Sequence, residues 1–194
     1  MLVGMDSRQK LIEATQELFW ERGYTATSPK AIQAAAGVGQ GSMYHHFQGK
    51  PGLGVAAIEA SAAGVRRDAI VLLEGPGSPL DRIRSYLTRP RHTLRGCRIG
   101  RLTADPDVVA DGRLLAPVQE NFVWLVDVLT DLIGQVQQAG DLQAELNALD
   151  LASTLVAVIQ GGYVLARAAQ SPEPFDRAVA GAMSMIDHLT TIRP

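Results

Sequence analysis

The segment from residue 27 to residue 50 constrains the fold more than any other, because it combines two short helical patterns with a glycine-containing turn. Ser28 is a favoured N-cap residue, and Pro29 follows at the first helical position, where the missing N–H of proline removes no hydrogen bond. Gly37 is suited to end this helix, since it takes a positive φ without a Cβ clash. The pattern predicts a helix, a turn of about four residues and a second, very short helix.

The second short helix is predicted over residues 40–47. Met43, Tyr44 and Phe47 recur at i, i+1 and i+4, which places them toward a core. The outer face then holds Gln40, Ser42 and His45. Two turns with such small and polar side chains bury too little to be stable alone, so we expect the surrounding helices to hold them. This layout is typical of a helix-turn-helix, in which the second helix enters the DNA major groove.

An amphipathic helix is predicted ahead of this segment, from about Ser7 to Arg22, with Gly23 at its end. Its apolar positions follow the spacing i, i+1, i+4, i+7 and i+8, and they are Leu11, Ile12, Thr15, Leu18 and Phe19. We therefore expect a three-helix DNA-binding domain over residues 1–50.

Residues 8–53 resemble the N-terminal domain of the TetR family of bacterial transcriptional regulators. The residues that carry the resemblance are Ile12, Ala14, Leu18, Phe19, Gly23, Tyr24, Thr27, Ile32, Ala35, Gly37, Val38, Gly41, Tyr44, His46, Phe47, Lys50 and Leu53. Its most specific part is the run from Ala36 to Lys50. The stretch Gly96-Cys97-Arg98-Ile99-Gly100 is similar to the LmrA/YxaF-like branch of the family.

The resemblance implies a set of DNA contacts. Phosphate contacts are implied for Thr27, Tyr44, His46 and Lys50. Base-edge contacts are implied for Gln40, Ser42 and His45. We add Ser28, Lys30 and Gly41, which lie in the same segment, to the candidate DNA-binding residues. Phosphate contacts set the register while groove side chains carry sequence preference, and glutamine can pair bidentately with adenine.

The chain departs from the family pattern at three places. Gly39 stands where the family usually has serine, so a helix cap and a phosphate-binding hydroxyl are lost. Pro51-Gly52 stands where glutamate normally follows the lysine, which weakens the start of the next helix. Lys30 occupies a position often held by an acid or a small residue.

Residues of this segment also fit roles other than DNA binding. Tyr44 and Phe47 fit the core at least as well as a DNA contact. His45 and His46 are adjacent and diverge by roughly 100° on a helix, so we expect no metal site. The glycines at 37, 39 and 41 follow no strand, which a dinucleotide-binding loop requires. We expect neither a metal nor a cofactor.

Composition agrees with a helical protein. A chain of 194 residues, 46% of them hydrophobic, is long enough for a sizeable core. Cys97 is the one cysteine, so no intrachain disulfide can form, and a reducing cytoplasm is the simplest setting. We identify no signal peptide, and the longest uncharged run, Leu151 to Ala166, is too short and polar to span a bilayer. No membrane association is therefore expected.

The formal net charge of −2 limits indiscriminate binding to nucleic acid. Residues 1–70 carry seven Lys/Arg against six Asp/Glu, and residues 71–194 carry eleven against fourteen. A strongly basic domain binds DNA of any sequence through counterion release, and this chain lacks one. Affinity must therefore come from a few placed contacts that a dimer duplicates.

The remainder of the chain, residues 51–194, is predicted to be a helical ligand-binding and dimerisation body. The expected helices run to about Leu73, then over 81–88, 96–104, from near Leu115 to before Gly140, over 150–169, and from Pro174 to about Ile192. Breaks are expected at 75–79 and at Asp105-Pro106. The whole is an all-α chain of about nine helices, in which the helix after residue 50 links head to body.

The helix from Asp150 is apolar nearly all round, which predicts burial on all sides. We expect it to form a four-helix bundle with the C-terminal helix and their copies across a two-fold axis, as in the family. The predicted dimer interface is Leu155, Val158, Ile159, Gly162, Met183, Ile186 and Leu189. Gly161-Gly162 would admit a partner backbone or a ligand. A monomer with a large core is the alternative.

Several aromatic and polarizable residues of the body have the composition of a ligand pocket, which is also that of an ordinary core. The candidates are Tyr86, Cys97, Leu102, Phe122, Leu125, Leu129, Gln160 and Tyr163, with Trp124 beside them. Residues 82–101 contain seven arginines and no acid. They form either a solvated face or an entrance that favours an anionic or planar ligand.

The sequence thus predicts a homodimeric repressor that binds a palindromic operator in double-stranded DNA and is released by an unidentified small-molecule ligand. A DNA-bound scaffold controlled by a protein partner is the alternative, and an activator is also compatible with the pattern. An enzyme would need a nucleophile–base pair or a metal cluster, and Cys97 with four scattered histidines matches neither.

Overall fold

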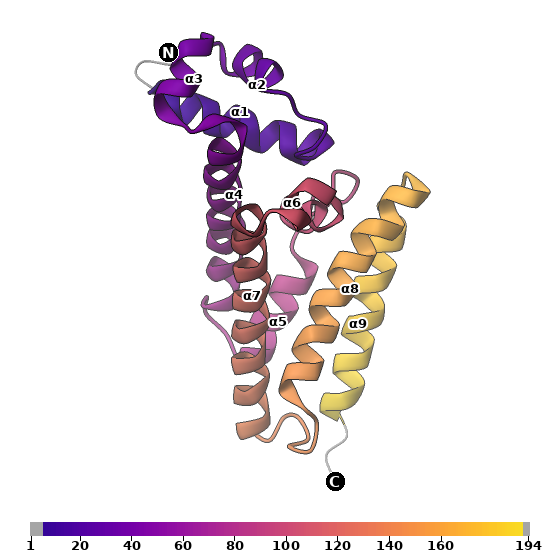
Figure 1. The fold of residues 1–194 in the computed structure, drawn as a ribbon. Coiled ribbons are helices and arrows are strands. Elements are labelled where there is room, and N and C mark those ends of the chain that lie inside the picture. Colours follow the sequence, from indigo (N-terminus) through magenta and orange to yellow (C-terminus); the bar gives the residue numbers. More distant parts are fainter. Residues whose placement is uncertain (1–5, 192–194) are drawn as a thin grey trace. The chain divides into compact units, whose positions relative to one another are not determined.

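The computed structural model describes residues 6–191, and all regular structure in that range is helical (Figure 1). The elements are α1 (Ser7–Arg22), α2 (Pro29–Ala36), α3 (Gln40–His46), α4 (Gly49–Leu73), α5 (Pro79–Thr88), η1 (Gly100–Ala104), α6 (Pro106–Ala110), α7 (Gly112–Gln138), α8 (Ala148–Ala169) and α9 (Glu173–Thr191). The all-α class is confirmed.

One expected helix is wrong, and the helix whose start Pro51-Gly52 was expected to weaken begins before Pro51. The helix expected over residues 96–104 is only the 3₁₀ turn η1, and Gly96, with a φ of 81°, lies outside helical backbone. The helix after α3 begins at Gly49, before Pro51. Pro51 thus lies in the first turn of α4, where backbone N–H groups have no partner within the helix, so it does not interrupt the helix.

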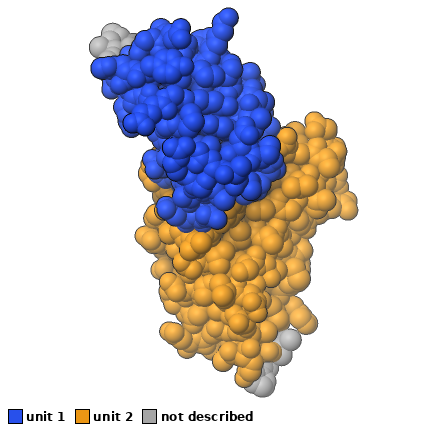
Figure 2. Space-filling model, viewed as in Figure 1, with its two compact units in different colours: residues 1–65, 98–121 blue, residues 66–97, 122–194 orange. Residues whose placement is uncertain are grey.

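The chain divides into two compact units, coloured separately in Figure 2. Unit 1 contains residues up to 65 and residues 98–121, and unit 2 contains residues 66–97 and 122–194. Helices α4 and α7 therefore contribute residues to both units. The head predicted over residues 1–50 lies in unit 1, which also takes in residues 51–65 and 98–121. The functional boundary at residue 50 stays a prediction.

Unit 1 has its own apolar core between the first helices and the start of α4. Its buried members are Leu11, Ile12, Leu18, Ile32, Met43, Phe47 and Leu53. Residues 98–121 contribute further buried apolar side chains to unit 1 and also make polar contacts with α1. Arg98 forms an ion pair with Glu17 and lies over the ring of Trp20, 3.8 Å from its centroid.

Unit 2 is a bundle of α5, the second part of α7, α8 and α9, in which α8 and α9 lie side by side (Figure 1). Ser78 and Asp81 form a capping box at the start of α5. Among the described residues, α8 is the one helix that is long and apolar enough to cross a membrane by length and composition. Its inner face packs in the core of unit 2, as a core helix of a globular domain does.

Candidate nucleic-acid interface

Helices α2 and α3 form the predicted helix-turn-helix. The Ser28 hydroxyl accepts a hydrogen bond from the N–H of Ala31, 3.2 Å away, and caps α2. Gly37 ends α2 with a φ of 64°, in the left-handed region that favours glycine. Gly39 precedes α3 with extended backbone and provides no side-chain cap. Helix α3 therefore depends on its neighbours for stability, as its short length requires.

The two faces of α3 differ sharply. Met43 is fully buried and Phe47 is 9% exposed, so both belong to the core of unit 1. Tyr44 is 55% exposed, and the expectation that it faces the core is wrong. Tyr44 follows Met43 by one position, about 100° round the helix, and Met43 already fills the space against the core.

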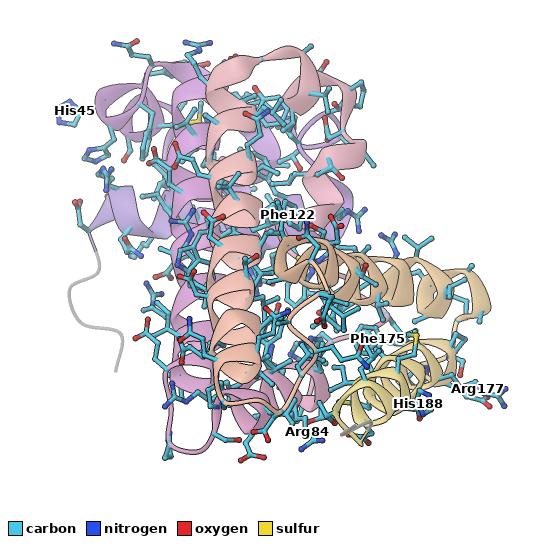
Figure 3. All side chains as sticks on the ribbon, turned by 90° about the horizontal axis from the view of Figure 1, so that it is seen from below. His45, Arg84, Phe122, Phe175, Arg177 and His188 are labelled. Carbon is cyan, nitrogen blue, oxygen red and sulfur yellow. The ribbon has the colours of Figure 1, made fainter. Side chains whose placement is uncertain are left out.

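The exposed face of α3 is a continuous strip. Gln40 and Tyr44 are four residues apart, and so are Gly41 and His45, and all four are exposed. His45 points away from the ribbon in Figure 3. We call these four residues the recognition strip. Polar tips with an amphipathic phenol suit both the base edges and the backbone of DNA.

Ser42 and His46 flank the recognition strip and are half-buried. The Nε2 atom of His46 lies 4.0 Å from the Asp6 carboxylate, so His46 has a partner when it is protonated. Ser28 and Lys30, at the start of α2, are exposed. Lys30 therefore presents an exposed cationic side chain at the start of α2.

Two of the residues implied as phosphate contacts are engaged within unit 1. Thr27 is fully buried, and its hydroxyl donates to the carbonyl of Gly23 at 2.6 Å. The Lys50 ammonium lies 4.0 Å from the centroid of the Tyr24 ring, and burial lowers its pKa. In this conformation Thr27 holds the loop after α1, while Lys50 must leave the ring to reach a phosphate.

One candidate was not found from the sequence. Arg8, exposed at the start of α1, lies with its guanidinium 5.4 Å from the centroid of the Phe47 ring, at the end of α3. It therefore places a cation beside the recognition strip. Its position on the polar face of an amphipathic helix was visible in the sequence, but its neighbour in space was not.

Two family models match the chain. Residues 11–57 match the bacterial regulatory proteins of the tetR family, and residues 79–182 match the tetracyclin repressor-like C-terminal domain. The chain belongs to the TetR family. It is a DNA-binding transcriptional regulator, and the first matched segment contains the helix-turn-helix described above.

Curated relatives of this TetR-family chain are transcriptional regulators. It is 28% identical over 173 residues to the repressor DhaR of a Mycobacterium species, covering 88% of this chain and 87% of DhaR. It is 26% identical over 189 residues to the repressor NemR of Escherichia coli, covering 93% and 94%. LmrA of Bacillus subtilis, from the branch that residues 96–100 resemble, is 25% identical over 176 residues, covering 87% and 90%.

The fold agrees with a solved relative. The crystal structure of the reduced form of Escherichia coli NemR superposes with a TM-score of 0.80 at 26% identity, covering 91% of this chain and 95% of that one. The similarity therefore extends through both family segments and is not limited to the helix-turn-helix.

The predicted ligand-pocket residues lie in several places, and their part in ligand binding stays a prediction. Tyr86, Leu125 and Leu129 are buried in the core of unit 2. Leu102 is buried and belongs to unit 1. The rest are half-buried in unit 2, and they are Cys97, Phe122, Trp124, Gln160 and Tyr163. Unit 2 has an apolar cavity of about 110 Å³ and a larger hollow of about 450 Å³, both lined by other residues.

Three of the seven predicted dimer residues are buried within their own chain and four are half-buried, and the dimer interface stays a prediction. Leu155, Ile159 and Gly162 are buried in unit 2. A Cβ on Gly162 would lie 2.8 Å from Cδ2 of Phe175, so this glycine makes room for Phe175 of the same chain. The half-buried members are Val158, Met183, Ile186 and Leu189. Within residues 6–191, no group of three or more His, Cys, Asp or Glu could hold a metal.

Proposed function

We propose that this regulator is a homodimeric repressor that acts in the cytoplasm, binds a palindromic operator and is released by a small molecule. The observation that carries the proposal is the recognition strip of α3, where Tyr44 is 55% exposed on a helix whose other face is buried. An exposed aromatic side chain on a short polar helix suits a surface that DNA covers.

The recognition strip would contact both parts of the duplex. Gln40 and His45 would face base edges, where glutamine can pair with adenine. Tyr44 would direct its hydroxyl to a phosphate while the ring packs beside the sugar, and Arg8 and Lys30 would add phosphate contacts. Thr27 has no such role in this conformation, because its hydroxyl is already used.

The outer face of α8 supports the dimer. Small side chains repeat along it at Ser153, Ala157, Gly161 and Ala168, and all are exposed in the single chain. Val164 is 68% exposed within this row, with Leu165 and, on α9, Met185 also exposed. Small residues at this spacing let two helices approach closely, and the exposed apolar side chains would be buried by the contact. We call this row, with Val164, the outer face of α8.

Release would follow from coupling between the units. Because α4 and α7 contribute residues to both units, a ligand that shifts either helix in unit 2 would act on unit 1. Moving a two-state equilibrium from 99:1 to 1:99 needs about 10⁴-fold differential affinity, or about 5.5 kcal/mol. A ligand that binds both states equally would not release the operator.

Selection of bound fragments from random double-stranded DNA tests the proposal. The full chain should enrich two inverted half-sites whose centres lie roughly 34–36 Å apart, or a modest multiple of a helical turn. Affinity for the selected site should fall steeply with salt, because each neutralised phosphate releases counterions. Enrichment of a single direct half-site, or of no sequence, would contradict a dimeric operator-binding repressor.

A further inference from the structure

We infer that the hollow of about 450 Å³ between the end of α5 and the start of α9 is a binding site for a small organic anion with an apolar body. The inference rests on the proposed function, in which the body of the regulator binds a ligand, and it names the class of that ligand. All residues that carry it belong to unit 2.

The hollow has one basic wall and one apolar wall. Arg89, Arg91 and Thr93 come from the segment after α5, while Phe175, Val179 and Met183 come from α9. Its size falls within the range of pockets that hold small ligands, and such pockets combine apolar walls with a few placed polar groups.

Arg91 is held in place by the end of α5. Its guanidinium donates to the carbonyls of Leu87 at 2.8 Å and Arg89 at 2.9 Å, and also to that of Tyr86. These contacts satisfy carbonyls that have no partner at a helix C-terminus. The group is therefore fixed before any ligand arrives, which reduces the entropic cost of binding.

Both arginines retain an unused donor. Nε of Arg89 and Nε of Arg91 are buried and have no hydrogen-bond partner among residues 6–191, as is also true of Nε of Arg66 and Arg82. The Arg89 guanidinium lies over the Tyr86 ring, 5.1 Å from its centroid. A buried donor without a partner costs free energy, so an acceptor that reached the Nε groups of Arg89 and Arg91 would offset that cost.

The charge around the hollow is also uncompensated. Arg84 pairs with Asp187 and Arg98 pairs with Glu17, whereas neither Arg89 nor Arg91 pairs with a carboxylate of residues 6–191. Burial lowers the pKa of Arg91, which shows that its charge is partly desolvated. An anion would offset that desolvation, since charge-assisted hydrogen bonds to guanidinium are among the strongest in proteins.

The walls select the kind of anion. Phe175 and Val179 would contact an apolar body, so a carboxylate on a ring or short chain fits better than inorganic phosphate. Asp176 is the one acid among the described lining residues, and it leaves the pair of arginines with a net positive charge. It should weaken binding of a monoanion through repulsion.

Isothermal titration of the full chain with benzoate, and with the neutral isostere benzamide, tests the site. Benzoate should bind saturably at one site per chain and benzamide at least tenfold more weakly. Arg89→Gln should weaken benzoate at least tenfold, and Asp176→Asn should strengthen it. Arg177→Gln is the matched control, because Arg177 is exposed, pairs with Glu173 on the same helix and points away from α9 (Figure 3).

Arg89→Lys separates loss of charge from a structural effect of replacing Arg89. It keeps the positive charge, so it should retain more affinity for benzoate than Arg89→Gln. Equal binding of benzoate and benzamide, absence of saturable benzoate binding, or equal losses in Arg89→Gln and Arg177→Gln would overturn the site. Operator selection with the wild-type chain is scored separately. An operator without benzoate binding refutes the anion site alone, and benzoate binding without an operator refutes the repressor alone.

Discussion

The carboxylate of Asp105 accepts two hydrogen bonds from Thr25, one from its backbone N–H at 2.9 Å and one from its hydroxyl at 2.6 Å. These bonds join the loop after α1 to the residue before α6, within unit 1. A Cβ on Gly23 would lie 2.9 Å from the same carboxylate, so glycine at this position admits the contact. The helix-turn-helix is therefore fastened to a segment 80 residues further along the chain.

Asp105→Asn should lower the free energy of unfolding by about 1–3 kcal/mol, because a buried acceptor is replaced by a group that donates toward Thr25. Burial acts to raise the pKa of Asp105, but its hydrogen bonds outweigh burial and the pKa is lowered. The contribution of the ionised form is thus present above the ordinary pKa and is lost as pH falls through the lowered value. Urea unfolding of both proteins should show a constant difference near neutral pH that narrows in acid.

Asp107→Asn is the matched control for this pair. Asp107 also accepts from the Thr25 hydroxyl, at 2.9 Å, but it is exposed. Water can replace that contact, so we expect Asp107→Asn to change the free energy of unfolding by less than about 0.5 kcal/mol. Equal losses in the two variants would contradict the role given to burial.

Tyr44→Ala should weaken operator binding at least tenfold while the melting temperature stays within about two degrees, because the side chain is exposed. Its neighbour Met43 provides the opposite case, since Met43→Ala should cost about 2–5 kcal/mol of stability through a cavity. Fluorescence anisotropy with a selected operator and thermal unfolding measure the two effects. If Tyr44→Ala lowers the melting temperature and leaves DNA affinity unchanged, Tyr44 is a core residue and not a DNA contact.

Alanine substitutions at the two adjacent glycines of α8 should change the stability of the chain in opposite directions. Gly162→Ala would place a Cβ 2.8 Å from Phe175, which also packs on Tyr163, and should cost about 1–3 kcal/mol. A Cβ on Gly161 meets nothing within 4 Å in the single chain, so Gly161→Ala should add up to about 1 kcal/mol to the stability of the monomer from helix propensity, while its extra methyl group should weaken the close helix contact of the proposed dimer. Chemical unfolding at one protein concentration compares them, and a neutral Gly162→Ala would contradict the packing.

Val164→Glu should convert the dimer to monomer, since Val164 is 68% exposed on the outer face of α8 and a buried carboxylate there would lack a partner. Val71→Glu is the control, because Val71 is 71% exposed on α4. Sedimentation velocity of the two variants shows which of them is a monomer, and so whether α8 or α4 forms the dimer interface. A dimer that survives Val164→Glu but not Val71→Glu would place the interface on α4.

Much of the local structure could be predicted because it depends on residues within one helical turn of each other. The Ser28 cap, the left-handed Gly37 and the bounds of α1 and α2 follow from side-chain type and spacing. Gly96 shows the limit of such patterns. Apolar residues after it are compatible with a helix, but Gly96 has a positive φ and only Gly100–Ala104 form a short 3₁₀ turn.

The site was only partly predictable, because exposure is decided by partners distant in sequence. Tyr44 and Phe47 carry similar aromatic rings, yet one is exposed and the other is buried against Leu11 and Leu53. Thr27 matches a family position for DNA contact, but its hydroxyl is used by Gly23. The apolar spacing of α8 identified a packed face, and only neighbouring elements show that this face belongs to the chain's own core.

The sequence by itself therefore determined the all-helical class, the helix-turn-helix and the family, since each depends on short-range pattern. Tertiary structure alone decided which side of α3 is free, that Phe175 fills the space at Gly162, and that Arg89 and Arg91 share a hollow. The physical reason is that burial and unpaired charge belong to groups of residues brought together by packing, and no single position in the chain encodes them.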